Sequence, residues 1–241
     1  MSTSALLGIV GGSGIALDGL LDEETHRVPF GEVFGLRAGS AEGHSHVFVY
    51  GRHGAYPVVL QCGRLHLYEG LSYAQVVRPV DVLYETGVRT ILFTNAAGGL
   101  LPEMKPGDLV AVDRVLRGPC RYWAEDPCST HGLEPKALLT DYRVPGCAFT
   151  GAYYWVPGPC YETRAEIAMM QTLGASAVGM SAAPELKRCR ELGIRAGVVS
   201  CVTNSCCRPH VLTHAQVLDA ARAASQRLAG TIRCAIPAIM A

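Results

Sequence analysis

The stretch Thr90-Ile-Leu-Phe-Thr-Asn-Ala-Ala-Gly-Gly-Leu100 joins a short apolar run to a run of polar and small residues. Residues 90–94 have the length and character of a buried strand, and residues 95–99 predict a loop at its carboxyl end. Similar apolar runs alternate with helical patterns along most of the chain, which is typical of a sheet packed between helices. In layered α/β sheets, ligands bind at the carboxyl ends of strands. The sequence therefore predicts an α/β fold with a ligand site at this edge.

The other expected elements follow from apolar periodicity and capping residues. Strands are expected at residues 6–10, 47–50, 57–63, 108–116, 153–156, 177–180 and 195–203, and helices at 73–85, 163–174, 183–192 and 213–228. Residues 117–151 are rich in Pro and Gly and are expected to be mostly loop, with at most one short helix at 135–140. No linker or repeat divides the chain, so residues 1–241 are expected to form a single domain.

The composition argues against several functional classes. The chain has 21 basic and 21 acidic residues, so no charge surplus attracts nucleic acid or an anionic membrane surface. The first apolar run ends at glycines before it could form a signal-peptide core, and no apolar stretch approaches the ~18 residues that span a bilayer. We therefore expect a cytoplasmic protein with a small-molecule ligand.

The ten cysteines form no regular framework and are expected to be reduced. Cys201, Cys206, Cys207 and His210 lie close in sequence, but their spacing lacks the paired C-x-x-C arms of zinc sites. No bound metal is expected, since buried cysteine is common in protein cores.

Two segments have residues suited to an anion. Ser13, in Gly11-Gly-Ser-Gly14, follows the first strand, where backbone N–H groups can turn toward a phosphate, although a tight turn without a ligand explains such glycines equally well. Arg64 and His66 lie two residues apart and would form an anion clamp if the strand continued through them. The alternative for this pair is a surface salt bridge to Glu69.

Two further segments suit a heterocycle. Tyr161 and Glu162 precede an expected helix, where the ring could stack on a base and the carboxylate could accept its hydrogen bonds. Glu162 could instead simply interact favourably with the helix dipole. Asn204 offers a donor and an acceptor at a strand end, as a purine requires, but Asn is also a common turn residue, and Met180 suits a core.

These segments together resemble a known family. Gly63-Arg-Leu-His-Leu-Tyr-Glu-Gly70, residues 95–100, Gly158-Pro-Cys-Tyr-Glu-Thr163, Val178-Gly-Met-Ser181 and Val202-Thr-Asn204 are similar to motifs of the trimeric purine nucleoside phosphorylases and the related methylthioadenosine phosphorylases. The resemblance covers most of residues 6–230. It implies the nucleoside phosphorylase fold, a mixed barrel-like sheet flanked by helices, in a homotrimer.

The resemblance also implies roles for individual residues. Phosphate would be held by Ser13, Arg64, His66, Ala96 and Ser181, and ribose by Tyr68, Met180 and His214. The purine would be held by Tyr161, Glu162 and Asn204, and catalysis would depend on Asn204, Glu162 and His66. Inorganic phosphate would be a co-substrate, with no further cofactor.

The expected reaction is phosphorolysis of a purine nucleoside. Breaking the glycosidic bond develops positive charge on the ribose, which bound phosphate can stabilise and then attack. Glu162 would accept a hydrogen bond from the N1–H of a 6-oxopurine, so inosine and guanosine are favoured. Three alternatives stay open at this point: a phosphorylase for 5'-modified nucleosides such as methylthioadenosine or methylthioinosine, a nucleoside-binding relative without turnover, and a structural α/β domain.

Overall fold

A computed structural model describes residues 6–12, 14–17, 19–33, 45–118, 136–207 and 213–241, except the side chain of His214. Its strands are β1 (Leu6–Gly11), β2 (Glu23–Pro29), β3 (Val47–His53), β4 (Tyr56–Cys62), β5 (Val88–Gly99), β6 (Leu109–Arg117), β7 (Lys136–Leu139), β8 (Phe149–Trp155), β9 (Ala175–Gly179) and β10 (Arg195–Ser205). Its helices are α1 (Tyr73–Glu85), α2 (Arg164–Thr172), α3 (Ala183–Leu192) and α4 (His214–Met240), with short 3-10 helices η1 (Phe30–Glu32) and η2 (Leu67–Glu69).

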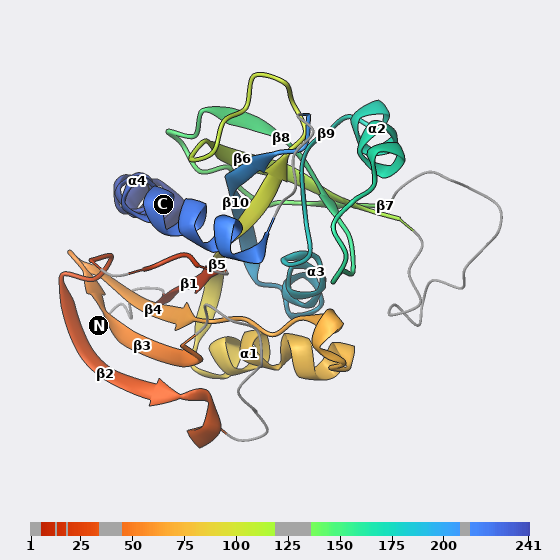
Figure 1. Cartoon of the computed structure of the whole chain (residues 1–241). Coiled ribbons are helices and arrows are strands. Elements are labelled where there is room, and N and C mark those ends of the chain that lie inside the picture. The colour runs from red at the N-terminus through yellow and green to blue at the C-terminus, as the bar shows by residue number, and fades with distance from the viewer. Residues whose placement is uncertain (1–5, 13, 18, 34–44, 119–135, 208–212) are drawn as a thin grey trace.

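The described strands form one mixed sheet in the order β10-β6-β8-β9-β5-β1-β4-β3-β2, with β7 paired to β6. Because β10 also pairs with β5, the strands β5, β10, β6, β8 and β9 close into a barrel. The strands β1 to β4 continue from the barrel as an open sheet, with β2 at its outer edge (Figure 1). The expected mixed, barrel-like sheet flanked by helices is confirmed.

Strand β5 connects the open sheet to the barrel. Its first half pairs in parallel with β1, and its last residues, Gly98 and Gly99, pair with β9 on the barrel side. The prediction of a loop at residues 95–99 was wrong, because the strand continues to Gly99. Gly99 allows close strand packing there, because a Cβ atom on Gly99 would lie 3.0 Å from Val202 Cγ1.

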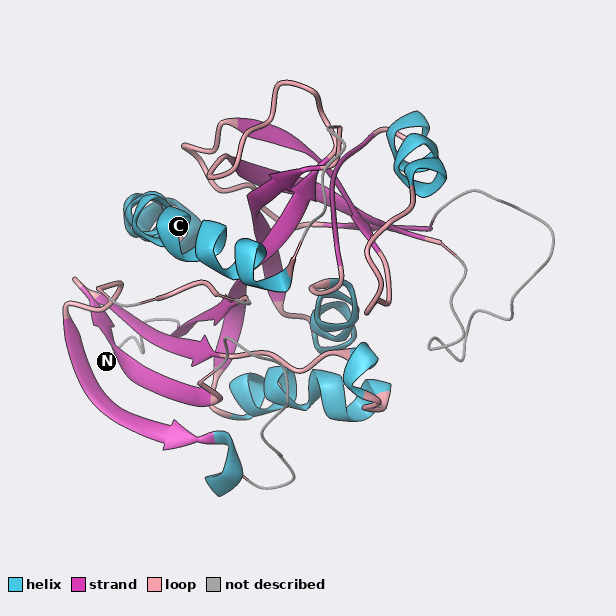
Figure 2. Ribbon diagram, in the orientation of Figure 1, coloured by secondary structure: helices cyan, strands magenta, loops and turns pink. Residues whose placement is uncertain are grey.

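Two apolar layers cover the two faces of the open sheet. Side chains alternate along β1 and β5, so that Ile9 and Leu92 face α4 while Val10 and Phe93 face the layer that contains α1 and α3. Figure 2 shows α4 on one side of the sheet and the α1–α3 pair on the other.

The positions of most expected elements are confirmed, including helix α1 with its Ser72 cap and helix α2 with its Thr163 cap. Residues 135–140 were expected to form at most one short helix, and this was wrong, because residues 136–139 pair with β6 as strand β7. Strand β2 was not expected, since its side chains are mostly exposed and lack apolar alternation.

Helix α4 runs well beyond the expected end at residue 228. Leu228, Ile232, Ile236 and Ile239 recur at helical spacing and are buried against the sheet. Burying each of these side chains contributes about 1.5–3 kcal/mol to the free energy of folding. Together they outweigh the unfavourable helix propensities of Gly230 and Pro237.

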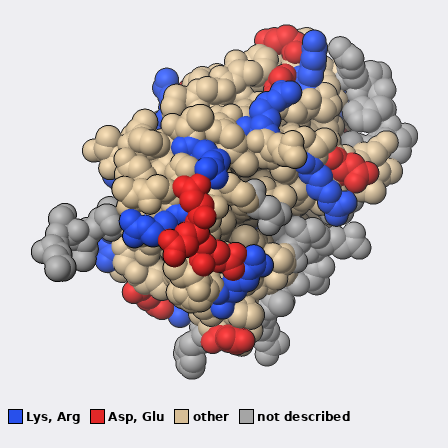
Figure 3. All heavy atoms as spheres, turned by 90° about the vertical axis from the view of Figure 1, so that its left-hand side faces the viewer, with Lys and Arg blue, Asp and Glu red and all other residues tan. Residues whose placement is uncertain are grey.

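Positive and negative side chains are mixed on the face shown in Figure 3, and neither sign dominates it. Among the described residues, no helix is long and apolar enough to cross a membrane.

Candidate active site

A pocket of about 340 Å³ lies at the carboxyl ends of the barrel strands. Ala96, Ala97 and Gly98 come from the end of β5, residues 178–181 from the end of β9, and Thr203 and Asn204 from the end of β10. The segments after β4 and β8 supply the other walls, and α4 adds Val217. The site therefore lies at strand ends, as the sequence predicts.

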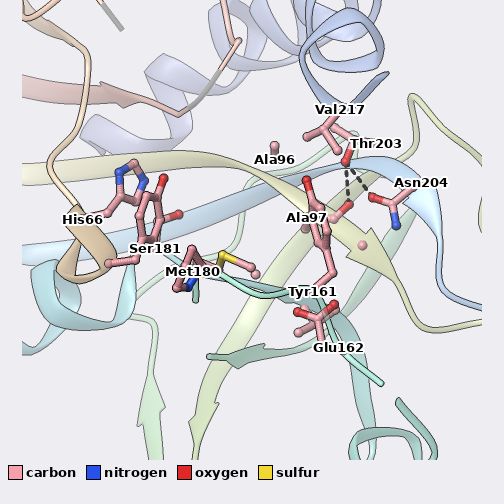
Figure 4. Close-up of a pocket in the computed structure, with 15 residues that line it drawn as sticks. His66, Ala96, Ala97, Tyr161, Glu162, Met180, Ser181, Thr203, Asn204 and Val217 are labelled. Atoms are coloured by element: carbon pink, nitrogen blue, oxygen red, sulfur yellow. Dashed lines mark hydrogen bonds between the residues drawn. The ribbon is translucent and has the colours of Figure 1, made fainter. Parts of the chain in front are cut away.

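The polar side chains gather at two ends of this pocket. Figure 4 shows His66 and Ser181 at one end and Tyr161, Glu162 and Asn204 at the other, with Met180 between them. The first group provides hydrogen-bond donors suited to an anion, and the second provides an aromatic face, a carboxylate and an amide suited to a base.

Arg64 supports the anion end from behind the pocket wall. Its Nη1 donates to Ser181 Oγ at 3.1 Å and to the carbonyl oxygen of Thr94 at 3.0 Å, and its Nε donates to Glu185 Oε1 at 2.7 Å. The Arg64 and Glu185 side chains are 1% and 3% exposed. Strand β4 ends at Cys62, so the condition for a strand-based clamp of Arg64 and His66 is not met.

Glu69 pairs with His66 rather than with Arg64. Glu69 Oε1 accepts from the His66 backbone N–H at 2.7 Å and lies 3.2 Å from His66 Nδ1, and both side chains are 4% exposed. The His66 ring also stacks on Tyr68, with 4.6 Å between centroids. Burial raises the pKa of Tyr68 to about 12, so its hydroxyl stays protonated. This frame fixes the imidazole at the pocket wall.

A strained turn presents Ser181. The backbone N–H of Ala183 donates to the Ser181 carbonyl oxygen at 2.9 Å, closing a three-residue turn around Ala182 with φ 70° and ψ −37°. This left-handed conformation is rare for a residue with a Cβ atom, and it persists only where the surroundings enforce it. Here the Ser181 N–H donates to Tyr153 Oη at 3.3 Å, and the Ala182 N–H donates to Glu185 Oε2 at 2.9 Å.

The carboxylate at the base end is Glu162. Burial raises the pKa of the Glu162 carboxyl, and the nearby Glu166 charge adds to this effect, while a backbone hydrogen bond opposes it. Tyr161 beside it is 44% exposed, so its ring presents a large apolar surface at the pocket mouth. A carboxylate next to an open aromatic face can bind a planar base that carries N–H donors.

Asn204 is oriented by its neighbours on β10. The single hydroxyl proton of Thr203 is shared between the Ala97 carbonyl oxygen at 3.2 Å and Asn204 Oδ1 at 3.0 Å (Figure 4). Asn204 Nδ2 donates toward Cys206 Sγ at 3.7 Å. An amide nitrogen has two N–H groups, so the second can serve a ligand in the pocket.

The structure brings most predicted site residues together. The pocket is lined by His66, Tyr68, Ala96, Tyr161, Glu162, Met180, Ser181 and Asn204. Arg64 reaches it through Ser181. Ser13 and the side chain of His214 lie outside the described residues.

Sequence reasoning missed several residues of the site. Thr203 and Val217 line the pocket, and their proximity to Asn204 and His214 in sequence was the available signal. Glu185 was missed because it lies 121 residues from Arg64, and no local pattern connects the two.

Metal ligands do not gather in the part of the chain that the structure describes. There, no three His, Cys, Asp or Glu side chains lie close enough to hold an ion. Cys201, Cys206 and Cys207 are unpaired thiols, and His210 lies outside the described residues.

Comparisons with known proteins agree with this geometry. A family model described as the phosphorylase superfamily matches residues 6–236. Purine nucleoside phosphorylase 1 of Geobacillus stearothermophilus is 32% identical over 235 residues, which cover 90% of this chain and 85% of that protein. The Mus musculus purine nucleoside phosphorylase is 33% identical over 230 residues, which cover 86% of this chain and 79% of that protein.

Solved structures give the same result. Isoform 2 of the Schistosoma mansoni purine nucleoside phosphorylase, in complex with cytosine and ribose-1-phosphate, superposes with a TM-score of 0.80 at 26% identity, covering 96% of this chain and 90% of that one. A Schistosoma purine nucleoside phosphorylase in complex with guanosine gives a TM-score of 0.80 at 27% identity, covering 98% and 91%. The chain therefore belongs to the phosphorylase superfamily and, within it, to the purine nucleoside phosphorylases.

Proposed function

We propose that this enzyme splits the glycosidic bond of purine nucleosides with inorganic phosphate, releasing the free base and ribose 1-phosphate, and that it prefers 6-oxopurines. The observation that carries the proposal is the two-ended pocket, with the Arg64-supported Ser181 and His66 at one end and Glu162 and Asn204 at the other. Phosphate is the co-substrate, and the reaction needs no other cofactor.

The pocket favours a dissociative reaction. Phosphate held at the Ser181 end would stabilise the positive charge that develops on the ribose and would then attack C1'. At the other end, the Asn204 amide would strengthen its hydrogen bond to purine N7 as the leaving base gains negative charge. Holding the two substrates together in one pocket supplies a further entropic advantage.

The preference for 6-oxopurines rests on Glu162. An ionised carboxylate accepts from the N1–H of hypoxanthine or guanine, whereas N1 of adenine has no proton to donate. We expect kcat/KM for inosine and guanosine to exceed that for adenosine by a factor on the order of 100 or more. Equal values for inosine and adenosine would exclude this assignment of Glu162.

A second candidate is a phosphorylase for 5'-modified nucleosides, favoured by one observation. Val217 places an apolar side chain in the pocket from the first turns of α4. The predicted contact of His214 with a ribose 5'-hydroxyl argues for unmodified substrates. Comparing inosine with 5'-methylthioinosine separates the two, because a strong preference for the methylthio compound would support the second candidate.

The proposal also includes one phosphorylase domain over residues 1–241, a homotrimeric assembly and a cytoplasmic location. Continuity of the sheet through the described strands supports the single domain. The cysteines in the described part of the chain form no disulfides, which suits a reducing compartment.

A further inference from the structure

Glu185 is a buried carboxylate with two distinct partners at the anion end of the pocket. Its Oε1 accepts from Arg64 Nε at 2.7 Å, and its Oε2 accepts from the backbone N–H of Ala182 at 2.9 Å. Arg64 in turn donates to Ser181 Oγ, and Ala182 is the centre of the strained turn that presents Ser181. One side chain on α3 therefore connects the guanidinium to the backbone that carries the pocket hydroxyl.

Capping the helix does not by itself require a carboxylate here. Glu185 is the third residue of α3, and the same position is occupied by Gln75 in α1 and Gln216 in α4, each of which accepts from the backbone N–H of its cap residue. A single amide oxygen is thus enough for the cap. The other oxygen of Glu185, Oε1, accepts the hydrogen bond from Arg64 Nε.

We infer that Glu185 is a positioning residue for phosphate, which acts by holding the Arg64 guanidinium and the Ser181 turn in one fixed relation. This inference rests on the proposed function and extends it beyond the residues that line the pocket. Arg64 Nη1 donates to Ser181 Oγ, so a rotation about the Arg64 side chain would shift the hydrogen bond that orients the pocket hydroxyl even when the charge is retained.

A positioning role and a simple charge effect of Glu185 change phosphate binding in opposite directions. If the carboxylate acted only as a negative charge, removing it would raise the positive potential and tighten phosphate binding. If it positions Arg64, removing one of its two acceptors weakens phosphate binding. In the structure the Ala182 N–H and Arg64 Nε meet different oxygens of Glu185, and Gln replaces one of these oxygens with an NH2 donor, so one of the two N–H groups would face a donor instead of an acceptor.

The test is steady-state kinetics of Glu185→Gln with inosine and phosphate varied separately. We expect KM for phosphate to rise about tenfold or more, the scale of one hydrogen bond to a charged group, while KM for inosine stays within about twofold. Glu185→Asp keeps the charge but shortens the side chain, so it should also raise KM for phosphate. Glu191→Gln is the matched control, because Glu191 forms ion pairs with Lys187 and Arg188 on the same helix away from the pocket.

A second measurement tests whether Glu185 affects KM for phosphate through Arg64. In an Arg64→Lys background, adding Glu185→Gln should leave KM for phosphate unchanged within about twofold, because the guanidinium that Glu185 positions is already gone. If Glu185→Gln fails to fold, Glu185→Asp and its double variant carry the same comparison.

An unchanged or lower KM for phosphate in the Glu185 variants would overturn the inference, as would equal rises in both KM values. If the wild-type enzyme itself shows no phosphate dependence, the proposed function fails separately. Calorimetric binding of inorganic phosphate to the wild-type and Glu185→Asp proteins then decides the inference: weaker binding to the variant supports it, and equal binding overturns it.

Discussion

Replacing Gly98 with alanine should lower the rate of inosine cleavage, because the added methyl group clashes with side chains at the purine end of the pocket. A Cβ atom on Gly98 would lie 2.5 Å from Cys206 Sγ and 3.4 Å from Asn204 Nδ2. Heavy atoms pack at about 3.5–4.0 Å, so the Cys206 sulfur must move by about 1 Å, and the Asn204 amide that donates toward this sulfur then loses the partner that orients it. Misplacement on this scale costs about 100-fold in rate.

We therefore expect Gly98→Ala to lower kcat/KM for inosine about 100-fold, equivalent to ~2.7 kcal/mol of transition-state stabilisation. Overpacking should also destabilise the fold by about 1–3 kcal/mol, measured by denaturant unfolding. Combining Gly98→Ala with Cys206→Ala removes the sulfur that blocks the new methyl group. This double variant should recover about tenfold or more of the lost rate, whereas Cys206→Ala alone should change it only slightly.

Gly230→Ala is the matched control, since no atom outside the adjacent residues and the neighbouring backbone of its own helix lies within 4 Å of the position its Cβ would occupy. This variant should keep wild-type activity. A Gly98→Ala enzyme within about threefold of the wild type would refute the steric argument, because the loss expected for such a displacement is about 100-fold. Failure of the double variant to recover any rate would refute the role assigned to Cys206.

Four other predictions concern the purine site, the stability of the fold and the proposed assembly. Glu162→Ala and Asn204→Ala should each lower kcat by a factor on the order of 100 or more, and near-normal rates in both variants would exclude the purine site. Burial raises the pKa of the Glu162 carboxyl, so KM for inosine should rise as the pH falls through that raised value, at a pH where an ordinary glutamate is still ionised; Glu162→Gln should remove this dependence. Tyr142→Phe should cost about 1–3 kcal/mol of stability in urea unfolding, because the Tyr142 hydroxyl donates to the buried Ile91 carbonyl oxygen at 2.7 Å; an unchanged midpoint would contradict this. Light scattering should give an assembly larger than the 25.7 kDa chain, and a monodisperse monomer would contradict the proposed homotrimer.

The fold could be predicted where local signals agree with tertiary packing. Ser72 and Thr163 accept hydrogen bonds from the N3 backbone N–H groups of α1 and α2, as their capping patterns predict. The end of β5 could not be predicted, because small residues at 95–99 suit both a loop and a strand packed closely against β9 and β10. Strand β2 is held by backbone pairing to β3, and its side chains are mostly exposed. Its sequence therefore has no apolar pattern from which the strand could be predicted.

The residues of the candidate site likewise divide into those with a local sequence signal and those that only tertiary packing brings together. His66, Glu162 and Asn204 stand in motifs that the sequence displays directly, and the structure places them around one pocket. Glu185 and Tyr153 form hydrogen bonds to residues far away in the sequence, and such partners become visible only when α3, β8 and the segments after β4 and β9 are folded together. The predicted roles of individual residues in catalysis remain predictions that the variants above can test.

Cleavage of inosine with and without inorganic phosphate, with ribose 1-phosphate assayed as the product, distinguishes phosphorolysis from hydrolysis and from binding without turnover. Hypoxanthine should be released only when phosphate is present, with one ribose 1-phosphate formed for each base released. Release of hypoxanthine and free ribose without phosphate, or tight inosine binding with no release under either condition, would contradict this expectation.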